Sequence, residues 1–89
     1  MTSRAEIRLA CRMIEMEALA AIEKFPTMNS GHEGKAVIEE ELEELWIEIK
    51  KYPNASKTLM AREAIQVGAM AARFIADVCP ILEEPKAKA

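Results

Sequence analysis

The fold is decided by residues 32–51, whose sequence is HEGKAVIEEELEELWIEIKK. Apolar side chains recur there at three- and four-residue steps, the period of an amphipathic helix. They are Ile38, Leu42, Leu45, Trp46 and Ile49. Ser30-Gly31-His32-Glu33 matches a capping box, in which serine and glutamate satisfy free amides at a helix start. Tyr52-Pro53-Asn54 ends the pattern, so we predict a helix over about 32–51.

Two more helices are predicted on either side of this one. The first covers about 4–24 and begins with a second capping-box match, Ser3 to Glu6. It has two apolar lines: Ile7, Cys11, Ile14, Ala18, Ile22 and Phe25, and on another side Leu9, Met13, Met16 and Ala20. The last covers about 56–78, with Met60, Val67, Met70, Ala71, Phe74 and Val78 on one face. Pro80 closes it, and we expect residues 80–89 to form a frayed tail.

These patterns predict one all-α domain over residues 1–89. The chain is 51% hydrophobic, with only 4% aromatic residues and six methionines, a composition that suits packed helices better than sheets. Short connections between long helices favour antiparallel neighbours. A three-helix protomer of this length buries little area, and its first helix is apolar on two sides. We therefore expect a homodimer or homotetramer that completes a four-helix-type bundle.

Charge and composition exclude several classes of partner. The net charge is −3 and no concentrated basic face is present, which argues against binding to a nucleic-acid polymer. No stretch approaches the roughly 18 apolar residues that span a membrane, and the first residues do not resemble a signal peptide. We expect a cytoplasmic protein without a membrane partner. Cys11 and Cys79 are expected to be buried free thiols, because each lies in or beside an apolar helical pattern.

The helix over 32–51 is unusually rich in glutamate. At about 100° per residue, Glu39 and Glu43 point away from the core. Four other glutamates share a sector roughly 60° wide beside the apolar stripe: Glu33, Glu41, Glu44 and Glu48. Like charges at this spacing repel one another. The sector is either a solvated face or a site that binds something positive.

Glu63 favours the second interpretation, because it lies on the same line as Val67, Met70 and Phe74, inside the apolar face of its helix. An ionised carboxylate in a core loses several kcal/mol of solvation unless it is paired or binds a metal. The alternative is a buried salt bridge to Arg12 or Arg73. Oxygen ligands of this kind select hard cations, so Mg²⁺ or Mn²⁺ is expected.

The acidic residues also resemble a known family signature. Glu40-Glu41-Leu42-Glu43-Glu44, followed after 18 residues by Glu63-Ala64-Ile65-Gln66, is similar to that of the MazG-like all-α nucleoside triphosphate pyrophosphohydrolases. In that signature a Glu-Glu-x-x-Glu block on one helix precedes a Glu-x-x-Asp block on the next. The flanking residues look like a small phage and prokaryotic branch of the family. The resemblance covers roughly residues 25–79.

The resemblance implies an oligomer that uses Mg²⁺ to hydrolyse a nucleoside triphosphate to the monophosphate and pyrophosphate. By position, Glu41 and Glu44 would be catalytic metal ligands, Glu40 would assist, and Glu63 would be the ligand of the second block. Gln66 stands where the family has aspartate; its amide can offer one oxygen to a metal but no charge, and it cannot act as a base. Asp77 is a distant candidate for the missing acid.

Other residues receive weaker assignments. Lys35, Lys57 and Arg62 are candidates to hold the phosphates of a nucleotide, or are simply solvated charges. His32 is expected to serve only as a residue at the helix start, and Trp46 to pack in the core rather than to stack on a base. The alternative to an enzyme is a non-catalytic helical oligomer that serves as a structural or protein-interaction module.

Overall fold

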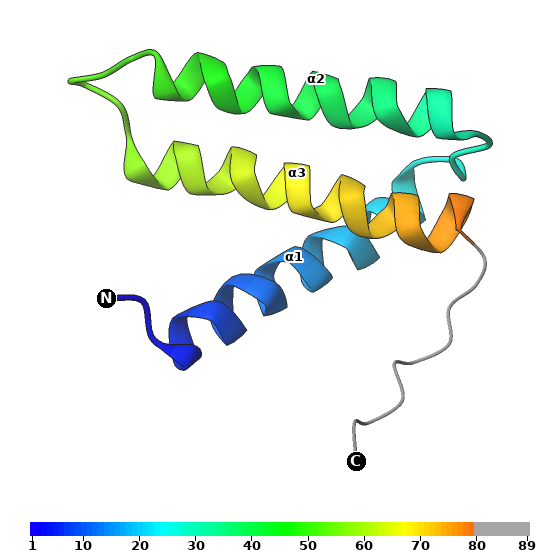
Figure 1. Cartoon of the computed structure of the whole chain (residues 1–89), viewed down its shortest axis with the longest axis horizontal. Helices are drawn as coiled ribbons and strands as arrows, with labels where there is room; N and C mark the ends of the chain where they lie inside the picture. Colours follow the sequence, from blue (N-terminus) through cyan, green and yellow to red (C-terminus); the bar gives the residue numbers. More distant parts are fainter. Residues whose placement is uncertain (80–89) are drawn as a thin grey trace.

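The computed structural model describes residues 1–79, which form three helices and no strand (Figure 1). They are α1 (Arg4–Lys24), α2 (Gly31–Ile49) and α3 (Lys57–Val78). The predicted all-helical fold and the predicted positions of the helices are confirmed; the bounds differ by at most two residues at either end. Pro80 and the predicted tail over 80–89 lie outside the described residues.

Each helix begins at a serine that accepts a hydrogen bond from the backbone N–H three residues further on. Ser3, Ser30 and Ser56 fill this position. At Ser3 the box is complete, because the Glu6 carboxylate also accepts the Ser3 N–H. At Ser30 the predicted box is only half formed. The Glu33 carboxylate accepts instead from the backbone and side-chain N–H groups of Asn29, and so fixes the loop before α2.

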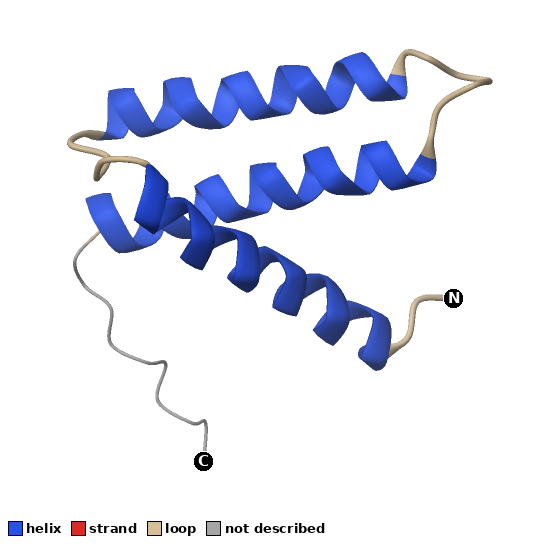
Figure 2. Cartoon of the chain, turned by 180° about the vertical axis from the view of Figure 1, so that it is seen from behind, coloured by secondary structure: helices blue, strands red, loops and turns tan. Residues whose placement is uncertain are grey.

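α3 is the central helix. α2 and α3 form an antiparallel pair, as predicted, and α1 packs on α3 without contacting α2 (Figures 1 and 2). α1 crosses α3 at an angle and runs in the same general direction. The expectation that sequence neighbours pack antiparallel is therefore wrong for α1. The loop over residues 25–30 carries the chain past the end of α3, so that α1 and α2 lie on different sides of it.

Two glycines allow α3 to approach its neighbours closely. A Cβ at Gly34 of α2 would overlap the ring of Phe74, and one at Gly68 of α3 would lie 2.7 Å from Cδ1 of Ile14 in α1. Neither glycine has a positive φ. Their role is to provide space for a large side chain from the facing helix.

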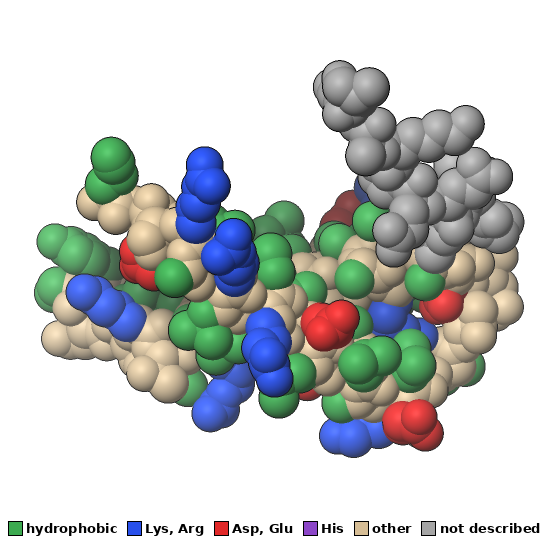
Figure 3. Space-filling model, turned by 90° about the horizontal axis from the view of Figure 1, so that it is seen from below, with side chains coloured by type: hydrophobic (Ala, Val, Ile, Leu, Met, Phe, Trp, Pro, Cys, Tyr) green, Lys and Arg blue, Asp and Glu red, His purple; other side chains and the backbone are tan. Residues whose placement is uncertain are grey.

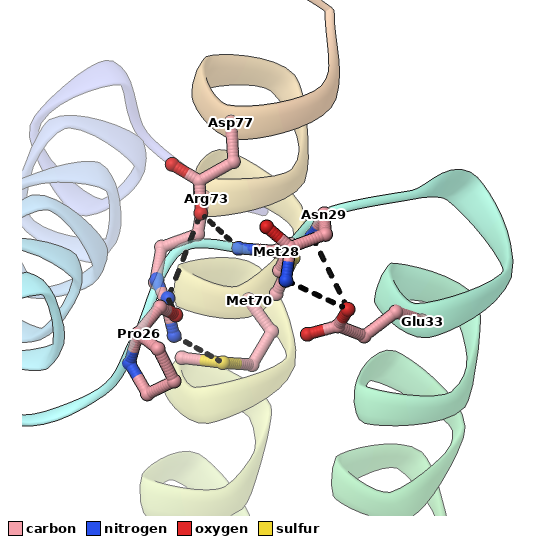
Figure 4. Close-up of polar contacts among 7 residues, drawn as sticks. All are labelled: Pro26, Met28, Asn29, Glu33, Met70, Arg73 and Asp77. Atoms are coloured by element: carbon pink, nitrogen blue, oxygen red, sulfur yellow. Dashed lines mark hydrogen bonds and ion pairs between the residues drawn. The ribbon is translucent and has the colours of Figure 1, made fainter.

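The core lies where the α1–α2 loop meets α3. Its buried hydrophobic residues are Ala21, Met28, Ala69 and Met70, with Ala18, Val37, Ile38, Phe74 and Val78 packed against them. Arg73 is buried beside them, and its guanidinium donates to the Pro26 carbonyl oxygen at 2.6 Å (Figure 4). Asp77 lies 3.6 Å from the same guanidinium and accepts the Met28 N–H at 3.0 Å. These contacts tie the loop to α3.

Many large apolar side chains in residues 1–79 stay exposed, against several sequence predictions. Cys11 is exposed and Cys79 is only half-buried, so neither is the buried thiol that we expected. In α1, Ile7, Ile22 and Phe25 are each more than half exposed, because α1 meets α3 along only part of its length. Figure 3 shows hydrophobic side chains interspersed with lysines and arginines on the face seen from below.

Trp46 is also wrongly predicted: it is 50% exposed, and Lys50 Nζ lies 5.6 Å from the centre of its ring. Residues 1–79 thus leave many of their large apolar side chains exposed.

None of the helices within residues 1–79 combines the length and the apolar character that crossing a membrane requires.

Candidate metal centre

Three carboxylates converge between α2 and α3. Glu41, Glu44 and Glu63 each place one oxygen within 4.8 Å of the others. Glu41 and Glu44 lie one helical turn apart on α2, and the antiparallel pairing brings Glu63 of α3 opposite them. This is the convergence of two helices that the sequence predicted. The site is shallower than expected, however, because Glu63 is only half-buried and Glu44 is exposed.

The pKa values show how poorly this cluster tolerates three negative charges. Partial burial is the main cause that raises the pKa of Glu41 to about 7, and the Glu44 carboxylate, Glu63 and Glu40 raise it further. Burial also raises the pKa of Glu63, followed by repulsion from Glu44 and Glu48, while Arg62 opposes this rise. A bound cation would remove the repulsion and favour the ionised form of all three groups.

The alternative of a salt bridge to a buried arginine is not realised at Glu63. The ion pairs within residues 1–79 join Lys35 to Glu39, Lys51 to Glu48, and Arg73 to Asp77. Arg73, which was the buried candidate, is held by Asp77 and Pro26. The three carboxylates therefore face one another without a salt bridge to a basic residue in the part of the chain that the structure describes. The charge of Arg62 lowers the pKa of Glu63 but does not offset its rise.

The other acids of the predicted sector have different partners. Glu48 accepts two hydrogen bonds from Lys51 Nζ. Glu33 is bound to Asn29 at the start of α2. Asp77, the distant candidate for the missing acid, is bound to Met28 and Arg73. Only Glu41 and Glu44 of the α2 sector contribute to the cluster.

Gln66 lies beside the cluster but is bound to α1. Its side-chain Nε2 donates a hydrogen bond to the carboxylate of Glu17. This contact brings an acid to the position where the family signature has its aspartate, although Glu17 is not one of the three clustered carboxylates. Glu40, the predicted assisting residue, is also outside the cluster; it is exposed and lines a neighbouring cavity.

Two cavities flank α3, and only the smaller is lined by a residue of the cluster. The larger, of about 800 Å³, lies between α1 and α3 and has an apolar floor that includes Met13, Met16 and Ile65. The smaller, of about 380 Å³, lies between the α1–α2 loop, α2 and α3, and is lined by Glu40, Glu41 and Arg73 among others. Gln66 lines both cavities. They therefore meet at Gln66, and Glu41 lines the smaller one.

The three basic residues predicted to hold phosphates do not lie together in the structure. Lys57 and Arg62 both line the larger cavity, where they could meet the phosphates of a ligand. Lys35 does not, because it lies on the exposed side of α2 and pairs with Glu39. His32 is exposed in the first turn of α2, as expected of a residue at a helix start.

Sequence reasoning missed Glu17 and the role of Arg73. The sequence position of Glu17 could have indicated a buried contact, because it lies next to Ala18 and one turn before Ala21, on the side of α1 that packs on α3. Its partner Gln66 is 49 residues away, and no local pattern gives that pairing. Arg73 was considered as a partner for Glu63, whereas its actual partners lie in the loop before α2.

Chemically, the arrangement offers three carboxylate oxygens to a hard cation, and Glu41 also lines the smaller cavity. Such a set of oxygens can hold a divalent metal. Comparison of this chain with models of known protein families, with curated proteins and with solved structures finds no match.

Proposed function

We propose that this chain is a Mg²⁺- or Mn²⁺-dependent nucleoside triphosphate pyrophosphohydrolase, related to the MazG-like family that its acidic blocks resemble. The observation that carries the proposal is the convergence of Glu41, Glu44 and Glu63 without a salt bridge to a basic residue among the described residues. The proposal includes a homo-oligomeric state and the cytoplasmic location expected from the sequence.

The geometry of the three oxygens fits a small divalent cation. Mg²⁺ binds oxygen at 2.0–2.1 Å in an octahedron, so its ligand oxygens lie about 2.9 to 4.2 Å apart. The three carboxylates already lie within 4.8 Å of one another. Rotation of exposed Glu44 about its side-chain bonds is enough to close the remaining gap, so Glu41, Glu44 and Glu63 would hold the ion.

Each group of the site has a task in this proposal. When bound, the metal supplies charge neutralisation for the triphosphate and lowers the pKa of a water molecule. Arg62, whose charge acts on Glu63, is the basic residue best placed to bind a phosphate oxygen, and Lys57 lies with it on the wall of the larger cavity. Water attacks a phosphorus of the bond between the α- and β-phosphates, and cleavage releases the monophosphate and pyrophosphate.

The test is pyrophosphate release from a panel of canonical and modified nucleoside triphosphates with Mg²⁺ or Mn²⁺. We expect release with at least one nucleotide, loss of at least a hundredfold in Glu44→Ala, and little change in Glu43→Ala, which alters an exposed acid one position away. Circular dichroism must show that both variants keep their helices.

Binding of Mn²⁺ alone, measured by calorimetry, tests the metal site separately. Glu44→Ala should weaken Mn²⁺ binding, and Glu43→Ala should not. Failure to bind Mn²⁺ would overturn the metal site, whereas Mn²⁺ binding with no turnover of any nucleotide would overturn the enzyme and leave the site.

That second outcome corresponds to our alternative function, a non-catalytic helical oligomer that serves as a structural or protein-interaction module. One observation favours it: position 66 carries an amide that is already hydrogen-bonded to Glu17. An amide without negative charge gives the site one acid fewer than the family signature contains.

A further inference from the structure

α2 carries an apolar ridge that no part of residues 1–79 covers. Leu42, Trp46 and Ile49 are 52%, 50% and 39% exposed. At about 100° per residue they lie within a sector roughly 60° wide. Leu45, on the edge of this sector, is half-buried against the rest of the chain. A tryptophan between two aliphatic residues on one exposed helix face has the composition of an interface centre.

Further large hydrophobic side chains of the same segment are exposed, since Ile47 is 48% and Tyr52 is 83% exposed. A standard protein interface takes about 800 Å² from each partner, and the ridge would form the centre of such a contact.

Charges along one flank of the ridge indicate which partner fits. Glu39, Glu43 and Lys50 follow one another on this flank, and Lys50 Nζ lies 5.6 Å from the centre of the Trp46 ring. Glu39 is already paired with Lys35 one turn earlier, so the charges that this flank leaves without an ion pair among residues 1–79 are the acid Glu43 and, beyond it, the base Lys50. In a parallel copy related by a two-fold axis, this flank would face the opposite flank of the partner helix, so Lys50 would not meet Glu39 and Glu43. An antiparallel copy would place Lys50 opposite the acidic pair.

We propose that the ridge of Leu42, Trp46 and Ile49 docks on the same ridge of a second copy of this chain. The two α2 helices run antiparallel about a two-fold axis near Trp46, so that Lys50 of each copy lies between Glu39 and Glu43 of the other. The contact is isologous, as expected for a homodimer. It lies on the flank of α2 away from Glu44. The proposal rests on the homo-oligomeric state that the proposed function includes and names its interface; pyrophosphate release by a chain that stays monomeric would overturn the interface and leave the activity.

The first experiment tests the apolar contact. Sedimentation velocity should show a dimer in the wild-type chain. The emission of Trp46, the single tryptophan, should shift to shorter wavelength as concentration rises and the ring leaves water. We expect Leu42→Glu to weaken association at least tenfold.

Ile47→Glu is the matched control, because Ile47 is 48% exposed on the same helix but lies outside the ridge. Association that survives Leu42→Glu but is lost in Met16→Glu would overturn the proposal and place the interface on α1. A wild-type chain that stays monomeric at 100 µM would overturn it as well.

The second experiment tests the antiparallel charge pairing. Lys50→Glu makes the flank wholly acidic, and Glu39→Lys with Glu43→Lys makes it wholly basic. Each variant alone should associate at least tenfold more weakly than the wild type, and an equimolar mixture should form a heterodimer. If the separate variants lose helix content, mixing should restore it. A mixture that associates no better than its components would overturn the antiparallel arrangement.

Discussion

Glu41 is the residue whose ionisation should govern the pH dependence of the metal-free protein. Partial burial and the neighbouring carboxylates raise its pKa from 4.5 to about 7 in the folded state. Between these two values the folded chain binds more protons than the unfolded chain, so stability falls as pH rises. We predict that the urea midpoint of the metal-free protein decreases between about pH 5 and pH 8.

Glu41→Gln should flatten this dependence, because a neutral amide carries no charge at any pH in the range. Glu43→Gln is the control, since Glu43 is exposed and lies outside the cluster. A profile that keeps its slope in Glu41→Gln would show that another group is responsible. Added Mn²⁺ should stabilise the protein most above pH 7, where Glu41 is ionised without the metal.

Gln66 and Glu17 provide a second prediction at the scale of single residues. The acid and the amide of this hydrogen-bonded pair can be exchanged in Glu17→Gln with Gln66→Asp, which keeps one donor and one acceptor. The exchange moves the negative charge from α1 onto α3, the helix that carries Glu63. Metal affinity rises with the charge of the ligands. We expect Mn²⁺ to bind about tenfold more tightly by calorimetry.

Glu17→Gln alone removes the same charge from α1 without adding one to α3, and it should not tighten Mn²⁺ binding. Equal affinities in the single and double variants would mean that position 66 lies too far from the three carboxylates to act as a ligand.

At the scale of elements, Gly34 determines how closely α2 approaches α3. The Cβ of Gly34→Ala would overlap the Phe74 ring and would also lie 3.3 Å from Met28 Sδ. Overpacking of this kind costs about 1–3 kcal/mol, and the better helix propensity of alanine offsets at most about 1 kcal/mol. We therefore predict that Gly34→Ala lowers the free energy of unfolding by about 1–2 kcal/mol, as measured by urea denaturation.

Gly31→Ala is the matched control in the same helix. Its nearest neighbour across the interface is Phe74 Cζ at 4.0 Å, an ordinary contact. It should leave stability unchanged or raise it slightly. If both variants behave alike, helix propensity rather than the space beside Phe74 determines the effect.

The helices could be predicted from the sequence because caps and apolar spacing depend only on residues close together in the chain. Apolar spacing at three to four residues located all three helices, with serine caps predicted for the first two. The 100° rule gave a sector of four glutamates, and the resemblance to the family signature selected Glu41 and Glu44 from it, which the structure places in the cluster. Contacts between distant residues were not predictable. The pairing of Glu17 with Gln66 and that of Arg73 with Pro26 depend on α1 crossing α3 rather than lying beside α2.

The same limit explains the wrong predictions of burial. The sequence predicted that α1, apolar on two sides, needs more than one partner and that the stripe of α2 packs in the core, but periodicity does not say whether the partner is the same chain. Trp46 and Ile7 satisfy the pattern of a core residue and are nevertheless at least half exposed. In this protein an apolar helix face is evidence for a contact, and the contact can lie between chains.

At the scale of the whole molecule, stability should depend on concentration. The buried core of residues 1–79 consists of two alanines and two methionines, which is little for a chain of this length. If a second copy covers the remaining apolar surface, unfolding converts one dimer into two chains. Each tenfold increase in concentration then adds about 1.4 kcal/mol to the apparent stability of the dimer. We predict a urea midpoint that rises on the order of 0.5–1 M per tenfold increase, between about 1 µM and 100 µM.

Leu42→Glu should remove this dependence, because the chain that unfolds is then a monomer whose midpoint is the same at every concentration. Its midpoint should lie below that of the wild type even at the lowest concentration at which the wild type is still dimeric. A wild-type midpoint that does not change with concentration would mean that the small core near Arg73 stabilises the single chain by itself. The exposed ridge of α2 would then contribute nothing to folding.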